Sequence, residues 1–344
     1  MTQDPYSVVL DGLTRARRTW AITGVAGFIG SNLLERLLCQ GQLVVGLDSF
    51  STGHRHNLEE VRALVGTEAF GRFRLIEGDI RDPEACREVC RGADVVLHQA
   101  ALGSVPRSLA DPVTTDAINA QGTLNMLLAA RDAGVGRFVY ASSSAVYGTN
   151  PALPKRETDP CEPASPYAVT KITNELYAAV VGQTSSLETV GLRYFNVFGP
   201  RQDPEGPYAA VIPHWFKAML SGETVYCNGS AEISRDFCFV EDVVQANILA
   251  GVREGSALSG QVYNIASGVR RSLGELFECL RERLIKQRPS LEHAALVIRE
   301  VRPGDIPHSL ADIAKATRDL GYASRHSLET GLDAALDWYL AHVC

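Results

Sequence analysis

A glycine-rich segment near the N-terminus constrains the fold of this chain more than any other feature. Gly24, Gly27 and Gly30 are spaced three apart, between a strand-like run at 20–23 and a helical pattern at 28–39. A strand, a tight turn and a helix in this order bring backbone N–H groups and a helix N-terminus together, where they can bind a pyrophosphate. The spacing differs from the general G-x-G-x-x-G fingerprint. Taken alone, the segment could therefore also be a glycine-rich turn that binds no ligand.

The alternation of strand-like and helical segments continues through the first half of the chain. Strand-like runs are found at 20–23, 44–48, 73–77, 95–98 and 137–141, with helical patterns at 28–39, 83–90 and 112–132 between them. This order predicts an α/β fold, a Rossmann-type doubly wound parallel sheet that is covered by helices on both faces. In such folds, ligands bind at the carboxyl ends of the strands.

The second half of the chain has a different pattern. Residues 196–208 are rich in Pro, Gly and polar side chains, and later strand-like runs at 224–227, 237–240 and 262–265 are mixed with helical segments. We therefore expect an N-terminal arm over 1–18, a dinucleotide-binding Rossmann domain over 19–195 and a smaller C-terminal substrate-binding lobe over 196–344. The lobe should be interleaved with the last strands of the sheet, because no clean linker separates the two.

The composition excludes several classes of protein. The formal net charge of −7 argues against non-specific binding of nucleic acid, which needs a basic surface. No apolar run approaches the roughly 18 residues that a membrane span needs, and residues 1–18 lack the apolar core of a secretory signal. We expect those residues to form a solvated arm. The eight cysteines are scattered and include no C-x-x-C pair, which predicts free thiols in a reducing cytoplasm and no metal site.

Acidic residues end the second and third predicted strands. Asp48 lies 18 residues after Gly30, where a carboxylate can accept hydrogen bonds from both hydroxyls of an adenosine ribose. A carboxylate at this place repels a 2′-phosphate, so we expect NAD rather than NADP as the cofactor. Asp79 and Ile80 follow the third strand, where an adenine edge can be read; an ordinary turn aspartate is the alternative.

Side chains that can transfer a proton follow the fifth predicted strand. A serine run at 142–144 comes directly after it, and Tyr167 and Lys171 lie farther on, in a helix that we expect to begin at Ser165. The i, i+4 spacing places Tyr167 and Lys171 on one helix face. A base that works near pH 7 needs the pKa of tyrosine, about 10, lowered by roughly 3 units, or about 4 kcal/mol. A nearby ammonium and a positively charged nicotinamide ring both favour the phenolate.

These motifs together resemble the extended short-chain dehydrogenase/reductases and, within them, the UDP-hexose 4-epimerases. The resemblance covers about residues 20–321, and its matching stretches are TGVAGFIG (23–30), GLDSFSTG (46–53), GDI (78–80), HQAALGSVPRS (98–108), YAVTK (167–171), LRYFNVFGPRQ (192–202), SRDFCFVEDV (234–243) and RPGD (302–305). The phrases HQAALGSVPRS and RYFNVFG are similar to those of the WbpP-type UDP-N-acetylglucosamine 4-epimerases. That branch acts on N-acetylated hexosamines or the corresponding uronic acids.

The resemblance implies a role for each matching residue. Tyr167 corresponds to the catalytic base, Lys171 to its partner and Ser143 to the catalytic serine, although Ser142 and Ser144 compete for that place. The cofactor-binding residues that it implies are Gly24, Gly27, Phe28, Ile29, Gly30, Asp48, Asp79, Ile80, Gln99, Asn119, Tyr167 and Lys171. The substrate-binding residues are Gly103, Ser104, Ser142, Ser143, Ser144, Asn196, Arg235, Arg302, Asp305 and Ser309. Within this set, Asn196, the two arginines and Asp305 correspond to contacts with the UDP group.

The activity that the resemblance implies is NAD-dependent 4-epimerisation of a UDP-N-acetylhexosamine, or its uronic acid, through a 4-keto intermediate. In family members restricted to unacetylated hexoses, a tyrosine stands at the position of Ser309 and closes the pocket beside C2. A serine leaves room for an N-acetyl group, and Gly103 and Ser104 are expected on the opposite side of the sugar. The resemblance also implies a homodimer that forms through the helices around 112–132 and 165–182.

Two other kinds of function remain open. The chain could be another UDP-sugar enzyme of this fold: a UDP-glucose/galactose 4-epimerase, a dehydratase or a decarboxylase. Dehydratases carry an Asp-Glu pair after the catalytic threonine and decarboxylases a glutamate nearby, whereas Ser144 and Ala145 stand at those positions here. A catalytically dead protein that only senses NAD is the second alternative, and the intact serine, tyrosine and lysine set argues against it.

Overall fold

A parallel sheet of seven strands forms the centre of the computed structural model, which describes residues 4–205, 209–253, 258–300 and 306–342. The order of the strands is β11-β6-β5-β4-β1-β2-β3. Their bounds are Thr19–Thr23 (β1), Leu43–Asp48 (β2), Phe73–Glu77 (β3), Val95–His98 (β4), Arg137–Ser143 (β5), Glu188–Tyr194 (β6) and Gln261–Ile265 (β11). The chain adds strands on one side of β1 and then on the other, so a crevice opens between the carboxyl ends of β1 and β4.

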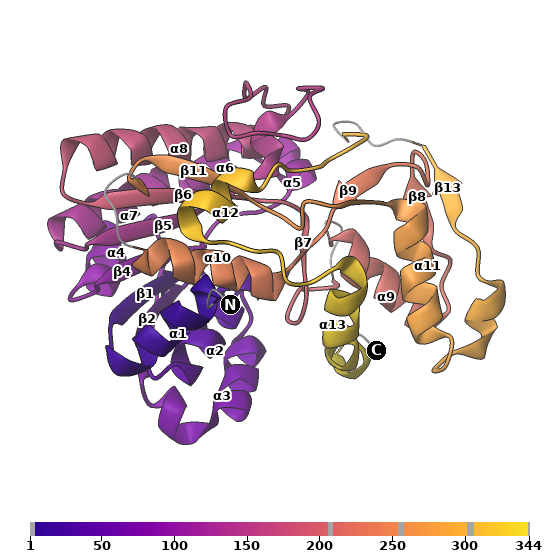
Figure 1. Ribbon diagram of the computed structural model, residues 1–344, viewed down its shortest axis with the longest axis horizontal. Helices are drawn as coiled ribbons and strands as arrows, with labels where there is room; N and C mark the ends of the chain where they lie inside the picture. Colours follow the sequence, from indigo (N-terminus) through magenta and orange to yellow (C-terminus); the bar gives the residue numbers. More distant parts are fainter. Residues whose placement is uncertain (1–3, 206–208, 254–257, 301–305, 343–344) are drawn as a thin grey trace.

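Helices cover both faces of the sheet (Figure 1). One face carries α4 (Pro83–Cys90), α7 (Gly122–Asp132) and α8 (Pro166–Thr184); the other carries α2 (Phe28–Cys39), α3 (Arg55–Phe70), α10 (Val240–Val252) and α12 (Ala314–Leu320). The alternation of side chains along β1 supplies both interfaces, because Trp20 and Ile22 enter one apolar core and Ala21 enters the other. The predicted α/β, doubly wound fold is therefore confirmed.

The predicted helix over 112–132 consists of three segments that follow one another without a break. They are α6 (Pro112–Asp116), a π-helical turn (Ala117–Gln121) and α7, and the short helix α5 (Val105–Ala110) precedes them. A π-helical turn inserts an extra residue into the helix and is often found near functional sites. Here the turn carries Asn119, whose side chain is fully buried.

The N-terminal segment is not the solvated arm that we expected. Residues Pro5–Arg15 form α1, whose first turn is capped by the Asp4 carboxylate accepting from the Ser7 amide at 3.0 Å. Tyr6 and Leu13 are buried against the sheet domain, and the buried Gln42 side chain donates to the Leu13 carbonyl at 2.7 Å. This tertiary contact converts a polar N-terminal stretch into an ordered helix.

The second half of the chain builds a smaller lobe, drawn at the right of Figure 1. Its helices are α9 (Val211–Ser221), α11 (Leu273–Leu284) and α13 (Leu328–His342). Short strands pair around them: β7 (Val197–Phe198) with β10 (Cys238–Phe239), β8 (Tyr226–Asn228) with β13 (Val297–Arg299), and β9 (Ser234–Asp236) with β12 (Arg270–Ser272). The chain leaves this lobe to form α10, β11 and α12 on the sheet, so the lobe and the sheet are interleaved.

The described part of the chain contains no helix that is both long and apolar enough to cross a membrane. The seven cysteines within it are free thiols, and Cys86 and Cys90 are buried side by side on α4.

Candidate active site

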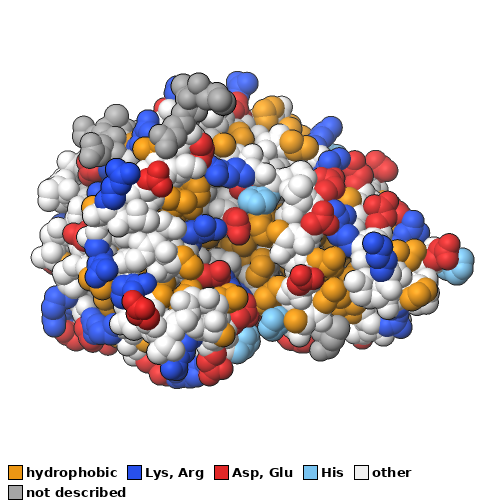
Figure 2. Space-filling model, turned by 60° about the horizontal axis from the view of Figure 1, so that its bottom comes forward, with side chains coloured by type: hydrophobic (Ala, Val, Ile, Leu, Met, Phe, Trp, Pro, Cys, Tyr) orange, Lys and Arg blue, Asp and Glu red, His pale blue; other side chains and the backbone are white. Residues whose placement is uncertain are grey.

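A cavity of about 440 Å³ lies at the carboxyl ends of the strands, where the sheet meets the segment that leads into the smaller lobe. The space-filling view shows a hollow with hydrophobic side chains at its floor and charged side chains and histidines around it (Figure 2). Most of the predicted site residues line this cavity: Gly24, Gly27, Phe28, Ile29, Gly30, Asp48, Asp79, Ile80, Gln99, Gly103, Ser142, Ser143, Tyr167, Lys171 and Asn196.

The glycine turn has a shape that larger residues cannot adopt. Gly24 has a φ of +68°, and a Cβ at Gly30 would lie 2.0 Å from the Gly24 carbonyl oxygen. The Gly27 amide donates to that same oxygen at 3.1 Å, which closes the turn directly before α2. The backbone and the helix N-terminus therefore form a cradle that fits the pyrophosphate of a dinucleotide.

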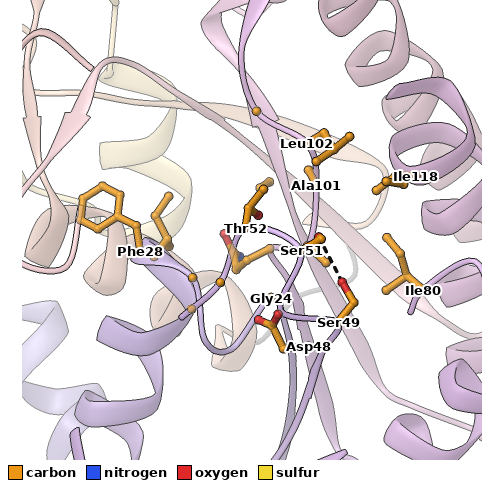
Figure 3. Close-up of a pocket in the computed structure, with 18 of the residues that line it drawn as sticks. Gly24, Phe28, Asp48, Ser49, Ser51, Thr52, Ile80, Ala101, Leu102 and Ile118 are labelled. Carbon is orange, nitrogen blue, oxygen red and sulfur yellow. Dashed lines mark hydrogen bonds between the residues drawn. The ribbon is translucent and has the colours of Figure 1, made fainter. Parts of the chain in front are cut away.

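Asp48 lies beside this turn at the edge of the cavity (Figure 3). Its carboxylate accepts from the Ala26 amide and from the Phe50 amide, each at 2.8 Å. Burial raises the pKa of Asp48, while these two backbone hydrogen bonds act in the opposite direction. The two bonds fix the carboxylate at the cavity edge, where the sequence predicted an acceptor for the ribose hydroxyls.

Asp79 and Ile80 line the same cavity, but the aspartate is already engaged. Its carboxylate accepts from the Arg81 backbone amide at 2.8 Å and from the Arg81 guanidinium at 2.7 Å. The hydrogen bond with the guanidinium lowers the pKa of Asp79. Ile80 and Ile118 form an apolar wall on the opposite side of the cavity from Phe28 (Figure 3).

Gln99 and Asn119, both predicted to bind the cofactor, have different places. Gln99 lines the cavity, and its amide contacts the Tyr194 hydroxyl at 3.1 Å and the Asn247 side chain at 3.0 Å. Asn119 lies behind the cavity wall, where its amide donates to the Leu102 carbonyl at 3.1 Å and accepts from the Leu102 amide at 2.8 Å. Asn119 thus holds the loop that lines the cavity without lining it itself.

Ser143, Tyr167 and Lys171 meet at the inner end of the cavity. Ser165 caps α8 by accepting from the Ala168 amide at 3.2 Å, and Pro166 is its first residue, as predicted for this helix start. Burial raises the pKa of Tyr167, whereas a hydrogen bond with Ser143 lowers it. The serine hydroxyl and the phenol thus lie near each other and line the same cavity.

Lys171 lies close to Tyr167, but a backbone carbonyl holds its ammonium. Its ammonium donates to the Ala141 carbonyl at 2.9 Å and lies 5.8 Å from the centre of the Tyr167 ring. Burial lowers the pKa of Lys171 to about 8, and the charge of Glu175 opposes this effect. The backbone carbonyl positions the ammonium, so its influence on Tyr167 is through space.

The three serines of the 142–144 run are distinguished by their contacts. The Ser142 hydroxyl donates to the Glu175 carboxylate at 2.5 Å and is buried. Ser143 lines the cavity beside Tyr167. Ser144 begins a 3₁₀ turn (Ser144–Tyr147) and is not among the residues that line the cavity. The geometry favours Ser143 over its two neighbours.

The remaining predicted substrate residues lie around the cavity or outside the described residues. Asn196 lines it and donates to the Asp236 carbonyl at 3.1 Å. Ser104 caps α5, and Arg235 donates to the Ser234 carbonyl at 3.0 Å; neither lines the cavity. Ser309 is half-buried beside β9, where its amide donates to the Ser234 carbonyl at 3.0 Å. Arg302 and Asp305 lie outside the described residues.

One cavity-lining residue to which our sequence reasoning gave no role is Arg201. It has a φ of +67° and is 4% exposed, and its guanidinium contacts Asn32 at 2.8 Å, Glu35 at 2.5 Å and Glu60 at 3.0 Å. These contacts tie the segment that follows β6 to α2 and α3. The only signal in the sequence was its place in the matching stretch LRYFNVFGPRQ, which does not say what an arginine there contacts.

Comparisons with known proteins agree with this site. The model of the NAD dependent epimerase/dehydratase family matches residues 20–266. The UDP-glucose 4-epimerase of Mycolicibacterium smegmatis is 36% identical in an alignment over 321 residues that covers 92% of this chain and 97% of that protein. The UDP-N-acetylglucosamine 4-epimerase of Methanobrevibacter ruminantium M1, solved with UDP-N-acetylmuramic acid, has a TM-score of 0.85 at 34% identity and covers 94% of this chain and 99% of its own.

A structure solved with the cofactor has the same architecture. The UDP-glucose 4-epimerase of Thermus thermophilus, in complex with NAD, has a TM-score of 0.80 at 32% identity and covers 95% of this chain and 100% of its own. The resemblance to UDP-hexose 4-epimerases is therefore confirmed, and the glycine cradle and Asp48 fit the cofactor that the family uses. The chain belongs to the NAD dependent epimerase/dehydratase family.

Proposed function

We propose that this protein is a 4-epimerase of UDP-N-acetylhexosamines, such as UDP-N-acetylglucosamine and UDP-N-acetylgalactosamine, or of their uronic acids. The coarse part of this function, an NAD-dependent enzyme of the UDP-sugar epimerase and dehydratase type, follows from the family. The observation that supports the epimerase chemistry is the set of side chains at the inner end of the cavity. Ser143, Tyr167 and Lys171 line the same cavity as the glycine cradle and Asp48.

The proposed chemistry assigns each of these side chains a task. Tyr167, as the phenolate, takes the proton of the C4 hydroxyl, and Ser143 orients the same oxygen. Lys171 is charged below its pKa of about 8 and favours the phenolate from a fixed position. When bound, NAD supplies the acceptor for the hydrogen of C4 and later returns it to the opposite face of the sugar. The protein holds the UDP group while the sugar turns between these two steps.

An elimination reaction is the main alternative, and the active-site residues argue against it. Dehydration needs an acid and a base that act on the carbons beyond C4. The positions where dehydratases carry these carboxylates hold Ser144 and Ala145 in this chain. Neither side chain can act as a general acid or base near neutral pH, so the set favours epimerisation alone.

The preference for an acetylated sugar rests on small side chains near the expected position of C2. Gly103 lines the cavity, and an added Cβ would have open space of 4 Å around it. Ser309 stands where a tyrosine closes the pocket of enzymes that are restricted to unacetylated hexoses. It lies beside β9 and is not among the residues that line the cavity, so its part in the pocket is a proposal from the resemblance.

Turnover of a panel of UDP-sugars tests this function. We expect a higher kcat/KM for UDP-N-acetylglucosamine and UDP-N-acetylgalactosamine, or for their uronic acids, than for UDP-glucose and UDP-galactose. The change Ser309→Tyr should suppress the acetylated substrates by about tenfold or more and spare the others, because a phenol ring fills the space beside C2. A wild-type preference for UDP-galactose, or an unchanged activity of the variant on acetylated sugars, would contradict the pocket argument.

We also propose that two copies of the chain associate. Apolar side chains of α5, α6 and α8 are exposed on one side of the molecule: Leu109, Val113, Val169, Leu176, Tyr177 and Val180. On α8 they lie opposite the face that carries Tyr167 and Lys171, and α5 and α6 pack against this helix. Such a stripe on neighbouring helices suits a symmetric helical interface between two subunits.

A further inference from the structure

The face of α8 that carries the active-site tyrosine and lysine continues for another turn. Tyr167, Lys171 and Glu175 are spaced i, i+4 and i+8, so their side chains follow one another along the helix. Each contacts one of three consecutive residues at the end of β5: Lys171 the Ala141 carbonyl, Glu175 the Ser142 hydroxyl and Tyr167 the Ser143 hydroxyl. The helix and the strand are thus joined residue by residue where the chemistry is expected.

Glu175 makes the strongest of these connections. Its carboxylate accepts from Ser142 at 2.5 Å and forms a two-point ion pair with the Arg193 guanidinium, at 2.8 Å and 2.7 Å. The side chains of Arg193 and Glu175 are only 4% and 11% exposed. Ser142 and Arg193 are also direct neighbours on the paired strands β5 and β6. A buried carboxylate that accepts two hydrogen bonds from a guanidinium and one from a hydroxyl fixes the positions of both partner side chains.

Glu175 also determines the charge balance around Lys171. The titratable groups near the ammonium are Tyr167 and Glu175 on its own helix and His98 on β4. On β6, Arg193 is the ion-pair partner of Glu175, and Tyr194 lines the same cavity as Lys171. Burial lowers the pKa of His98 to about 3, and the charge of Lys171 adds to this effect, so the imidazole is neutral. Glu175 thus supplies negative charge that favours the charged form of the buried lysine.

We propose that Glu175 is a positioning residue of the active site, which fixes the serine-bearing end of β5 through Ser142 and places a carboxylate one helix turn from Lys171. This proposal deepens the proposed function, because it concerns the same serine, tyrosine and lysine. Loss of the carboxylate removes the negative charge that lies one turn from Lys171 on α8 and frees the Ser142 hydroxyl. Both changes weaken the site without removing any group that touches the substrate.

An ion pair between β5 and β6 provides a matched control. Arg137 and Glu188 lie opposite each other at the start of β5 and β6, and the Arg137 side chain is 8% exposed. This pair joins two strands as the Arg193–Glu175 pair joins a strand and a helix, but it lies at the amino ends of the strands, away from the cavity. A purely structural role for Glu175 predicts similar consequences for Glu175→Gln and Glu188→Gln.

The titration of Lys171 distinguishes the two roles directly. The chain has five lysines, so selective ¹³C labelling of the lysine side chains gives few NMR signals, and Lys171→Met assigns the one of interest. In the NAD-loaded protein, Glu175→Gln should lower the pKa of Lys171 by about one unit or more, a tenfold change in its protonation equilibrium. Glu188→Gln should leave it unchanged, and Glu175→Asp, which keeps the charge, should restore most of the wild-type value.

The pH profile of turnover provides the second readout. The alkaline limb of kcat should move to lower pH in Glu175→Gln, because the charged lysine is lost earlier, and should stay in place in Glu188→Gln. An identical Lys171 titration in wild type and a folded Glu175→Gln variant would overturn the proposal.

A variant of the partner arginine keeps the proposal testable if Glu175→Gln does not fold. Arg193→Met leaves the Glu175 carboxylate without its opposing charge, so the pKa of Lys171 should rise above the wild-type value. A value at or below that of the wild type would overturn the proposal. The NMR titration needs no sugar turnover, so failure of the proposed function would show separately, as absence of epimerisation in the wild type.

Discussion

At the residue scale, the chemistry depends on how a buried tyrosine loses its proton. Burial raises the pKa of Tyr167, and the hydrogen bond with Ser143 only opposes that effect. We expect Tyr167→Phe to lower kcat by about 100-fold or more, since it removes the proton acceptor and almost no volume, while the bound NAD and the affinity for UDP stay close to wild type. Turnover assays together with nucleotide analysis of the denatured protein check this. Activity within about tenfold of wild type, a loss near 1.4 kcal/mol, would exclude Tyr167 as the base.

The positions of some of these residues could be predicted from the sequence and others could not, because only some of their contacts are between residues close together in the chain. Tyr167 and Lys171 share a helix face by their spacing alone, so their proximity could be predicted locally. The serine could not be chosen in this way, because Ser142 is held by Glu175, 33 residues farther along the chain. Asn119 was expected near the cofactor from the family resemblance. Its amide contacts the backbone of Leu102, 17 residues away, behind the cavity wall, and this contact could not be predicted locally.

At the element scale, the predicted strands and helices of the first half were confirmed because their signals are local and periodic. The glycine turn, β2 and the capped start of α8 each follow from a few consecutive residues. The helix α1 was missed because its two buried residues, Tyr6 and Leu13, find their partners in segments that are distant in the sequence. Short strand pairs such as β8 and β13, about 70 residues apart, are set by the lobe's packing in the same way.

The segment that leads into α13 is held by an ion pair that depends on pH. The Asp242 carboxylate, 1% exposed on α10, accepts from the His326 ring at 2.9 Å and from the His326 amide at 3.2 Å. The hydrogen bond with Asp242 raises the pKa of His326, which burial opposes and the charges of Asp242 and Glu241 support. The imidazole is therefore more basic in the folded chain than in the unfolded one, where its pKa is about 6.5.

Because of this difference in pKa, the His326–Asp242 ion pair stabilises the folded chain most at acid pH. A histidine whose pKa is raised by folding stabilises fully below about pH 6.5, and the contribution is lost as the pH rises through the folded value. Between pH 6 and pH 8.5 the melting temperature of the wild type should fall by about 1–2 °C more than that of His326→Asn. His293→Asn, at an exposed position, should follow the wild type. If the melting temperatures of wild type and His326→Asn depend equally on pH, the titration of the His326 ring does not contribute to stability.

At the scale of the whole molecule, the active site and the apolar stripe use opposite faces of one helix. The face of α8 toward the sheet carries Tyr167, while its outer face carries Leu176 and Val180, which are 63% and 57% exposed. A soluble monomer rarely leaves such a stripe uncovered next to a further exposed side chain like Val113, 78% exposed on α6. Packing against a second copy would also stiffen the helix that positions the tyrosine and the lysine.

We therefore expect light scattering to give a mass of about twice the 37.2 kDa of one chain at micromolar concentration. Leu176→Glu places a charge in the centre of the stripe and should shift the mass toward a single chain, since a buried unpaired carboxylate opposes association. Leu64→Glu is the matched control, because Leu64 is 60% exposed on α3, away from α8, and should leave the mass unchanged. A wild-type mass near one chain refutes the dimer, and a dimer that survives Leu176→Glu places its interface elsewhere. If dissociation of Leu176→Glu also lowers kcat while the bound NAD is retained, the interface supports the geometry of α8 as well as the association of the subunits.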